Sequence, residues 1–413
     1  MDTPPPLPRP GRASWGWLIA TYLGSGFPLG LVRAVPSAYL TDRGVRQEDL
    51  GLLALLELPY ILKFAWAPLV DRFGSRRAWI VSSLAVLAGA TALLPTLPAA
   101  GAVSAGLAVL LFGMAVVSAT QDIAVDARAV EAFPTETSGH VSAVRVNAAR
   151  VGYLLAGSAL VALAGPWAWG DVFLVAAGVL AALALVATRL PHAPRRPVPA
   201  EPFLAPLVRL LARPGFAAVA AFLFLFKLGD NALAEMTTPF LKAKLEAGGA
   251  GWGNDTLGAA RLPGIAASIV GAALGGWFTV RRGIVPAIVV LGGLQAASNL
   301  VYAGAAASPT PLWTWSAVLV EPFCGGLGMA PYGAVMLRSC SSRSPGADFA
   351  ALTTFMALSR LAAGAASGYG AAALGRPAYF ALTAAVALPA FAFLPAVRRW
   401  LAAPPDDAAP SRA

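Results

Sequence analysis

Two aspartates, Asp122 and Asp126, lie at the end of an otherwise apolar stretch of the sequence. They are four residues apart, so on an α-helix their carboxylates lie one turn apart on the same face. The run 101–122 has the length of about 20 residues that a helix needs to cross a bilayer. A carboxylate at that depth costs about 3 kcal/mol and usually has a function. The pair therefore indicates a protein that moves something across a membrane.

The composition excludes a soluble protein of ordinary type. Of the 413 residues, 58% are hydrophobic and 12% are charged, whereas soluble domains carry about 25% charged residues. The net charge of +10 does not indicate nucleic-acid binding, because the basic residues lie in short segments between apolar runs. Two histidines and two cysteines leave little material for metal ligation or histidine chemistry. We therefore expect no enzymatic activity, no metal and no cofactor.

Twelve apolar runs are long enough to cross a bilayer, and the Gly and Pro inside several of them are tolerated in membrane helices. We expect these spans at 15–40, 50–70, 78–98, 101–126, 139–164, 168–190, 214–241, 255–280, 284–306, 311–338, 347–374 and 376–397. The connections are short, and the longest, at 189–213, is rich in Pro and Arg. The predicted fold is therefore an all-α membrane protein with 12 transmembrane helices in two six-helix halves.

The distribution of Lys and Arg predicts the orientation of the chain. With the N-terminus inside, 18 basic residues fall in inside segments and five in outside loops, which places both termini in the cytoplasm. The expected parts are a cytoplasmic tail at 1–14, an N-terminal bundle at 15–190, a cytoplasmic linker at 191–213, a C-terminal bundle at 214–400 and a cytoplasmic tail at 401–413. Only four of the 30 basic residues are Lys, which favours a GC-rich bacterial genome and an inner membrane.

Further charged residues lie inside the expected spans. The basic ones are Arg33, Lys63, Arg145, Arg150, Lys227, Arg261 and Arg360. The acidic ones, besides the first pair, are Glu57, Asp230, Glu235 and Glu321. Counting from the start of each span places Lys63, Arg150, Lys227, Asp230, Glu321 and Arg360 nearest the midplane, and Asp126 and Arg145 toward the cytoplasm.

Two interpretations of these charges stay open. In the first interpretation the charges form structural ion pairs, as the i, i+3 spacing of Lys227 and Asp230 allows. Alternatively, midplane cations bind an anionic substrate while one carboxylate carries a coupling proton. Six charges near one plane exceed what packing needs, which favours function for the set. The same choice applies to polar uncharged residues, which can hydrogen-bond a sugar or amide or join helices. These are Gln121, Gln295, Ser298, Asn299, Thr237 and Thr238.

A short basic motif is repeated weakly. Residues 71–77 (DRFGSRR) follow the second span, and 275–282 (GGWFTVRR) follow the eighth as a degenerate copy. The first motif and the two six-helix halves resemble the major facilitator superfamily, which places substrate between the halves near the bilayer midplane. By analogy with that fold, spans four, seven and ten line the cavity, and they carry Asp122, Asp230 and Glu321.

Longer strings are more specific. The sequence resembles the AmpG-type muropeptide permeases over nearly its full length. The matching strings include 24–29 (GSGFPL), 58–72 (LPYILKFAWAPLVDR), 118–127 (SATQDIAVDA), 226–241 (FKLGDNALAEMTTPFL), 269–276 (IVGAALGG), 294–299 (LQAASN), 321–328 (EPFCGGLG) and 349–360. The second and third occur in order and in the expected spans.

The resemblance implies a proton-driven importer of N-acetylglucosaminyl-1,6-anhydro-N-acetylmuramyl peptides, from periplasm to cytoplasm, for peptidoglycan recycling. It implies proton coupling by Asp122, Glu321 and Asp230. Contacts to the anionic glycopeptide are expected from Lys63, Gln121, Lys227, Arg261, Gln295 and Arg360. Gating or structural roles are expected for Asp71, Arg72, Arg76, Asp126 and Arg150. The expected partners are the substrate, protons and membrane lipid, without nucleic acid, and the expected state is a monomer.

The sequence also departs from the family pattern. Arg128 stands one position earlier than the basic residue that usually follows the aspartate pair, a rotation of about 100° around the helix. Charged Arg33, Glu57 and Glu235 stand where neutral residues are expected. These changes keep a second hypothesis open: a facilitator carrying another anionic cargo, such as an acyl-coenzyme A, a siderophore or a drug. A membrane-embedded enzyme or sensor is disfavoured, since the loops are short and His is nearly absent.

Overall fold

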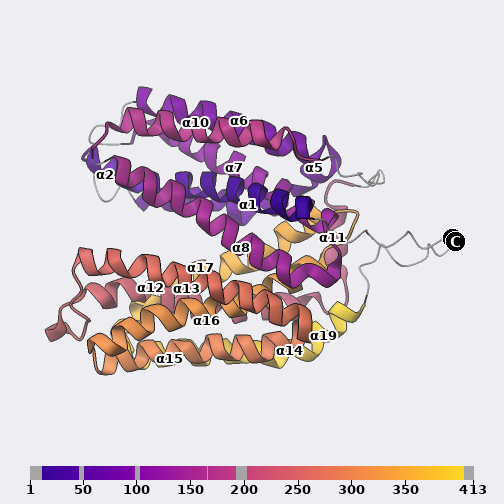
Figure 1. Cartoon of the computed structure of the whole chain (residues 1–413). Helices are drawn as coiled ribbons and strands as arrows, with labels where there is room; N and C mark the ends of the chain where they lie inside the picture. The colour runs from indigo at the N-terminus through magenta and orange to yellow at the C-terminus, as the bar shows by residue number, and fades with distance from the viewer. Residues whose placement is uncertain (1–11, 46–50, 98–102, 165, 192–201, 404–413) are drawn as a thin grey trace. The chain divides into compact units, whose positions relative to one another are not determined.

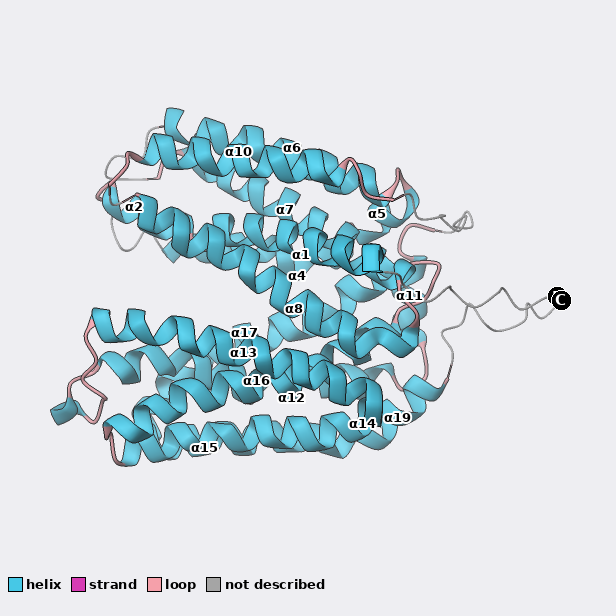
Figure 2. Cartoon of the chain, in the orientation of Figure 1, coloured by secondary structure: helices cyan, strands magenta, loops and turns pink. Residues whose placement is uncertain are grey.

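The computed structural model describes residues 12–45, 51–97, 103–164, 166–191 and 202–403, and every regular element among them is helical (Figure 2). Ten helices in this part of the chain are long and apolar enough to cross a membrane. They are Ser14–Asp42, Arg76–Thr96, Ala105–Ala132, Ser138–Leu163, Trp169–Ala187, Phe216–Lys242, Leu262–Arg282, Ile284–Ala307, Pro345–Leu374 and Arg376–Ala402. The predicted all-α membrane fold is confirmed.

The other two expected spans, 50–70 and 311–338, are helical as well. The first consists of four short helices: η1 (Gly51–Glu57), α4 (Leu58–Leu62), η2 (Lys63–Ala65) and α5 (Ala67–Arg72). Pro59 and Pro68 stand at the starts of α4 and α5, where a residue without an N–H is tolerated. The resulting breaks place Lys63 in a turn of 3-10 helix. The second is one helix, α16 (Pro311–Ser339).

The helices of the first half follow the predicted spans. They are α1 (Arg12–Arg33), α2 (Val35–Asp42), α6 (Arg76–Leu93), η3 (Leu94–Thr96), α7 (Ala105–Ala132), η4 (Thr135–Thr137), α8 (Ser138–Leu154), the π-helix η5 (Leu155–Leu160), α9 (Val161–Leu163) and α10 (Trp169–Ala187). The hydroxyls of Ser75 and Ser104 cap α6 and α7 by accepting hydrogen bonds from Ala78 N and Leu107 N, which satisfies N–H groups that have no partner inside the helix.

The helices of the second half are α11 (Ala205–Ala212), α12 (Phe216–Lys242), η6 (Leu245–Ala247), α13 (Asn254–Arg282), α14 (Ile284–Ala287), η7 (Ile288–Gly292), α15 (Gly293–Ala307), α16, α17 (Pro345–Leu374), α18 (Arg376–Ala387), η8 (Leu388–Phe393) and α19 (Leu394–Ala402). The short helix α11 lies inside the stretch predicted as a linker, 191–213. The predicted tails, 1–14 and 401–413, lie largely outside the described residues.

The chain divides into two compact units. The first unit comprises Met1–Pro134, Val144–Val208 and Cys340–Thr354, and the second comprises Thr135–Ala143, Arg209–Ser339 and Phe355–Ala413. Their main boundary, between 208 and 209, falls in the predicted linker. The first turns of α17 belong to the first unit, and the start of α8 belongs to the second. A simple division into bundles at 15–190 and 214–400 stays a prediction.

Glycines bring helices of the first unit into close contact. A Cβ added to Gly26 on α1 would lie 1.9 Å from the carbonyl oxygen of Ala149 on α8. A Cβ added to Gly152 on α8 would lie 2.2 Å from the carbonyl oxygen of Leu23. The two backbones therefore pack directly against each other, as small residues allow in membrane helices. Helices α6 and α10 pack side by side in the same unit (Figure 1).

Glycines also allow close packing in the second unit, between α13 and α16, which form its most extensive helix pair. A Cβ added to Gly271 would lie 2.0 Å from the carbonyl oxygen of Phe323. An aromatic core forms around Phe240, Tyr302 and Phe380, whose rings meet at centroid distances of 5.5 to 6.4 Å. Aromatic packing of this kind contributes beyond the apolar area that it buries.

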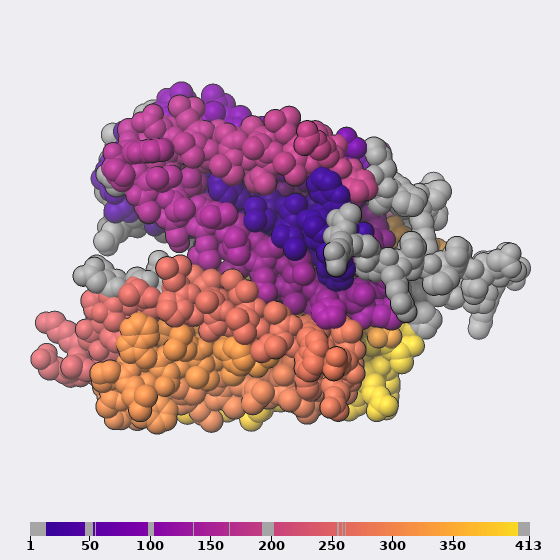
Figure 3. Space-filling view, in the orientation of Figure 1, coloured from indigo at the N-terminus to yellow at the C-terminus, as the bar shows by residue number. Residues whose placement is uncertain are grey.

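Large apolar side chains stay exposed on the outer faces of the helices. Val109, Leu185 and Leu262 are 73%, 68% and 75% exposed. Figure 3 shows the side-chain surface of one face of the molecule, coloured along the chain. In a membrane protein, lipid covers such exposed apolar side chains.

Candidate functional site

A buried ion pair joins Lys63 to Asp122 in the first unit. Lys63, in η2, is only 4% exposed, and its Nζ lies 2.5 Å from Oδ2 of Asp122 on α7. The other carboxylate oxygen, Oδ1, accepts a hydrogen bond of 3.1 Å from the hydroxyl of Ser25 on α1. The Asp122 side chain is 24% exposed, so the pair is open to solvent on its acidic side. The matching strings 58–72 and 118–127 therefore meet in space.

A second ion pair lies one helical turn along α7. Oδ1 of Asp126 accepts hydrogen bonds from Nε of Arg145 on α8, at 2.9 Å, and from the hydroxyl of Tyr22 on α1, at 3.0 Å. The Arg145 guanidinium lies 4.8 Å from the centroid of the Phe349 ring, a distance at which a cation is attracted to the ring face. The Asp126 side chain is 1% exposed. Asp126 is therefore a buried member of the site.

The two pairs form one group, which we call the central cluster: Lys63, Asp122, Asp126 and Arg145, with Tyr22 and Ser25. Nζ of Lys63 also lies 3.9 Å from Oδ2 of Asp126. The two acids and two bases sum to zero formal charge. Removing one partner of a buried pair costs about 3–5 kcal/mol, because the other charge is left uncompensated. Among the four charges, Asp122 is the most exposed, so it is the group best able to exchange a proton with solvent.

Polar residues extend from the central cluster along α7 and the second span. Ser118, Asp122 and Asp126 are spaced by four residues, and this row is about 12 Å long at 1.5 Å per residue. The Tyr60 hydroxyl donates a hydrogen bond of 2.8 Å to the Ser118 hydroxyl. Tyr60 and Ser118 were not predicted as site residues. Their spacing could have identified them, because Tyr60 precedes Lys63 by three residues and Ser118 precedes Asp122 by four.

Two of the charges that depart from the family pattern pair with each other. Nη2 of Arg33 lies 2.5 Å from Oε2 of Glu57. The Arg33 guanidinium also lies 4.5 Å from the centroid of the Tyr60 ring. The two extra charges therefore neutralise each other and add no net charge to the first unit.

The basic motif after the second span holds the start of α17. The Asp71 carboxylate accepts hydrogen bonds from the backbone N–H groups of Gly346, at 3.1 Å, and Ala347, at 2.8 Å. Both N–H groups belong to the first turn of α17, where the helix dipole favours a negative charge. Arg76 lies 2.7 Å from both Asp71 and Glu131. The gating or structural role expected of Asp71 and Arg76 stays a prediction.

Arg72 and Arg150 lie elsewhere in the first unit, on α5 and α8. Nη2 of Arg72 donates a hydrogen bond of 2.8 Å to the carbonyl oxygen of Pro202. Arg150 is half-buried on α8. Neither belongs to the central cluster.

The predicted site residues of the second unit lie on five helices, α12, α13, α15, α16 and α17. Lys227 and Asp230 form a 2.5 Å ion pair within α12, and each residue is 9% exposed. Glu321 is half-buried on α16. Arg360, on α17, is exposed and forms no ion pair with the described residues. The side chain of Arg261, on α13, lies outside the described residues.

A family comparison identifies the fold. Residues 18–364 match the family model described as Major Facilitator Superfamily. The chain belongs to the major facilitator superfamily. This facilitator is therefore a multi-pass membrane transporter of a small molecule and not an enzyme, as predicted.

The facilitator is similar to bacterial permeases along most of its length. The anhydromuropeptide permease of Escherichia coli (strain K12) is 30% identical over 398 residues, which cover 93% of this chain and 79% of that protein. An uncharacterized protein of Haemophilus influenzae is 29% identical and covers 90% of this chain and 92% of its own length. The putative transporter AmpG 4 of Rickettsia felis is 25% identical, with coverages of 90% and 93%.

Two solved structures share the fold at low sequence identity. The human organic anion transporter MFSD10 (TETRAN) has a TM-score of 0.72 at 16% identity and covers 94% of this facilitator and all of that chain. The E. coli fucose:proton symporter FucP has a TM-score of 0.69 at 13% identity, with coverages of 94% and 98%.

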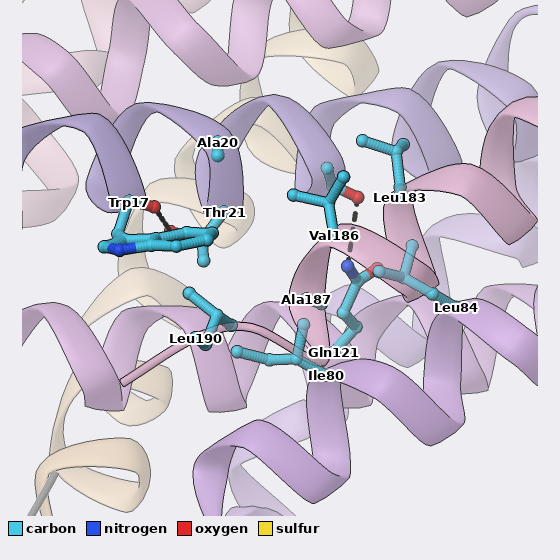
Figure 4. Close-up of a pocket in the computed structure, with 11 residues that line it drawn as sticks. Trp17, Ala20, Thr21, Ile80, Leu84, Gln121, Leu183, Val186, Ala187 and Leu190 are labelled. Carbon is cyan, nitrogen blue, oxygen red and sulfur yellow. Dashed lines mark hydrogen bonds between the residues drawn. The ribbon is translucent and has the colours of Figure 1, made fainter. Parts of the chain in front are cut away.

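The two glutamines predicted to contact substrate are buried in the facilitator. Gln121 is 0% exposed, and its Nε2 donates a hydrogen bond of 3.0 Å to the carbonyl oxygen of Gly24. It lines a mostly apolar pocket between α1, α6, α7 and α10, beside Trp17 and Leu84 (Figure 4). Gln295 is 2% exposed on α15. Contact with substrate stays a prediction for both residues.

Proposed function

We propose that this facilitator imports anhydro-muropeptides, N-acetylglucosaminyl-1,6-anhydro-N-acetylmuramyl peptides, from periplasm to cytoplasm in symport with protons. The observation that carries the proposal is the 30% identity to the E. coli anhydromuropeptide permease over 93% of the chain. The strings that contain Lys63 and the Asp122–Asp126 pair meet in the central cluster. A charged cluster inside a membrane protein is most often part of a substrate or proton path.

Protonation of Asp122 links the proton to an anionic cargo. With Asp122 ionised, the four charges of the central cluster sum to zero. With Asp122 protonated, Lys63 and Arg145 face Asp126 alone, and the sum becomes +1. A positive centre in a low-dielectric surrounding favours a carboxylate-bearing ligand. Proton and anion therefore bind more strongly together than either binds alone, which is the condition for symport.

Other residues take supporting roles in the proposal. Arg360 is exposed and can bind an anion without breaking an ion pair, whereas Lys227 must first leave Asp230. Asp230 and Glu321 are further proton carriers in this scheme, and Arg261 and the two glutamines are further contacts. Asp71, Arg72, Arg76 and Arg150 hold or gate the helices. The proposed location is the bacterial inner membrane, with a monomer whose two termini are cytoplasmic.

Uptake into proteoliposomes tests the function. Labelled anhydro-muropeptide is offered to purified facilitator with an inward proton gradient, without a gradient and with a protonophore. We expect accumulation that requires the gradient and that excess unlabelled anhydro-muropeptide abolishes. If an acyl-coenzyme A or a siderophore competes and muropeptide does not, the proposed cargo is wrong and the competing compound takes its place. Uptake at the same rate with and without the proton gradient would contradict the proposed coupling to protons.

Reporter fusions test the orientation. Green fluorescent protein at the C-terminus is expected to fluoresce, and alkaline phosphatase at the same place is expected to be inactive, because the terminus is cytoplasmic in the proposal. The opposite pair of results would reverse the orientation that the Lys and Arg counts predict.

A further inference from the structure

One oxygen of a buried carboxylate in the central cluster has no hydrogen-bond donor. Oδ1 of Asp126 accepts hydrogen bonds from both Tyr22 and Arg145. Oδ2 accepts none from the described residues, although the side chain is 1% exposed. A buried charged acceptor without a donor is uncommon, because burial removes its water without replacing it.

The Lys63 ammonium lies beside that oxygen. Its Nζ is 2.5 Å from Oδ2 of Asp122 and 3.9 Å from Oδ2 of Asp126. An ammonium carries three N–H donors, and among the described residues only Asp122 accepts a hydrogen bond from this one. A movement of Nζ by about 1 Å brings it to the 2.7–2.9 Å that a charged hydrogen bond to Asp126 requires.

We propose that Asp126 is the second acceptor of Lys63. When Asp122 is ionised, Lys63 binds Asp122. When Asp122 takes up a proton, Lys63 moves to Oδ2 of Asp126 and keeps a charged partner. The part that this movement plays in proton coupling rests on the proposed function, whereas the movement itself is a property of the protein alone. Asp126 is then a positioning residue that keeps Lys63 paired in both states.

Among the ionisable groups around the central cluster, Asp126 is the alternative charged acceptor for Lys63. The ionisable groups that face Asp122 or Asp126 from neighbouring elements are Tyr22 on α1, Tyr60 on α4, Arg145 on α8 and Cys340 after α16. Arg145 offers only donors. The hydroxyls of Tyr22 and Tyr60, which donate to Asp126 and Ser118, are neutral and cannot balance the charge of an ammonium. Asp126 is the second carboxylate within 4 Å of Lys63.

The movement of Lys63 links protonation of Asp122 to the contacts that Asp126 makes with α1 and α8. Asp126 holds Arg145, which is on α8, and Tyr22, which is on α1. When Lys63 joins Asp126, the carboxylate is shared between two cations, and its hold on Arg145 weakens. Protonation at the half-buried Asp122 therefore changes the contact of α7 with α8.

Thermal unfolding of the purified protein tests the proposal without cargo or gradient. Asp122→Asn mimics the protonated state, and we expect this variant to fold with an apparent Tm within about 3 °C of the wild type. Adding Lys63→Met should then lower the Tm by about 5 °C, since it removes the Lys63–Asp126 pair. If Lys63 had no second acceptor, the same change would remove an unpaired buried charge and raise the Tm. An unchanged or higher Tm, or an Asp122→Asn variant that does not fold, overturns the proposal.

A second background ties the effect to Asp126. With both Asp122→Asn and Asp126→Asn in place, Lys63→Met should raise the Tm, or restore folding, because no carboxylate is left for the ammonium. Failure to do so overturns the assignment of Asp126. Lys244→Met, at an exposed lysine that forms no ion pair with the described residues, is the matched control and should leave the Tm unchanged. These results do not depend on whether uptake of anhydro-muropeptide is found.

Discussion

Arg33 and Glu57 form an ion pair of 2.5 Å between α1 and η1, although each stands where the family pattern leads one to expect a neutral residue. Replacing one member leaves the charge of the other without a partner. Glu57→Gln should therefore lower the apparent Tm by about 2–4 °C, which corresponds to about 1 kcal/mol. Arg33→Gln should do the same, and the double variant should lose less than the two singles together. Thermal unfolding of the three variants measures this coupling. Additive losses would show that the pair contributes nothing, and Glu246→Gln, at an exposed residue, is the control.

Asp122→Asn should abolish gradient-driven uptake while the protein stays folded. The amide cannot carry a proton, so the coupling of proton to cargo is lost, and we expect accumulation to fall at least about 100-fold, in the range of general acid–base groups. Uptake into proteoliposomes at equal protein content measures the loss. Asp171→Asn, at an exposed carboxylate in the first turn of α10, should transport normally. Full uptake by Asp122→Asn would remove Asp122 from the mechanism.

Gly26→Ala should destabilise the first unit. The added methyl would lie 1.9 Å from the carbonyl oxygen of Ala149, so α1 and α8 must separate. Overpacking of this kind costs about 1–3 kcal/mol, or a Tm lower by about 3–10 °C. Gly89→Ala lies inside α6, and the added Cβ would have no atom of another described helix within 4 Å. This change should raise the Tm slightly, because Ala favours a helix. Equal effects of the two changes would contradict the close packing.

The two cysteines should react with a maleimide only when the protein unfolds. Cys340 is 7% exposed and Cys324 is 9% exposed, and neither forms a disulfide in the described part of the chain. Burial raises the pKa of the Cys340 thiol, which disfavours the reactive thiolate. We expect slow labelling in the native state and two labels per chain after heating. Ser308→Cys, at an exposed position after α15, should label at once and at a rate that rises with pH. Rapid labelling of the native wild type would show that the cysteines are accessible.

Much of the fold could be predicted because its causes are local. An apolar run of about 20 residues forms a helix in a membrane whatever its neighbours are. The shared face of Asp122 and Asp126 follows from their spacing on α7. The pairing of Lys227 with Asp230 likewise needs only an i, i+3 spacing on one helix, and the structure contains that ion pair.

The partners of the site residues could not be predicted in the same way. Counting along the spans placed Asp126 near the cytoplasmic surface as a gating or structural residue, yet it lies buried beside Lys63, 63 positions earlier in the chain. Tyr22 and Ser25 were not selected at all, because a hydroxyl in an apolar helix has no distinctive pattern. Only their contacts with Asp126 and Asp122 reveal them.

The sequence by itself determined the class of protein, its helices, the residues that carry charge into the membrane and the family pattern that they follow. The tertiary structure decided which charges meet: Lys63 with Asp122, Arg145 with Asp126, Arg33 with Glu57, and Asp71 with the start of α17. Helix formation depends on hydrogen bonds between residues four positions apart. Ion pairs between helices depend instead on how backbones pack, and in this chain glycines such as Gly26 set that distance.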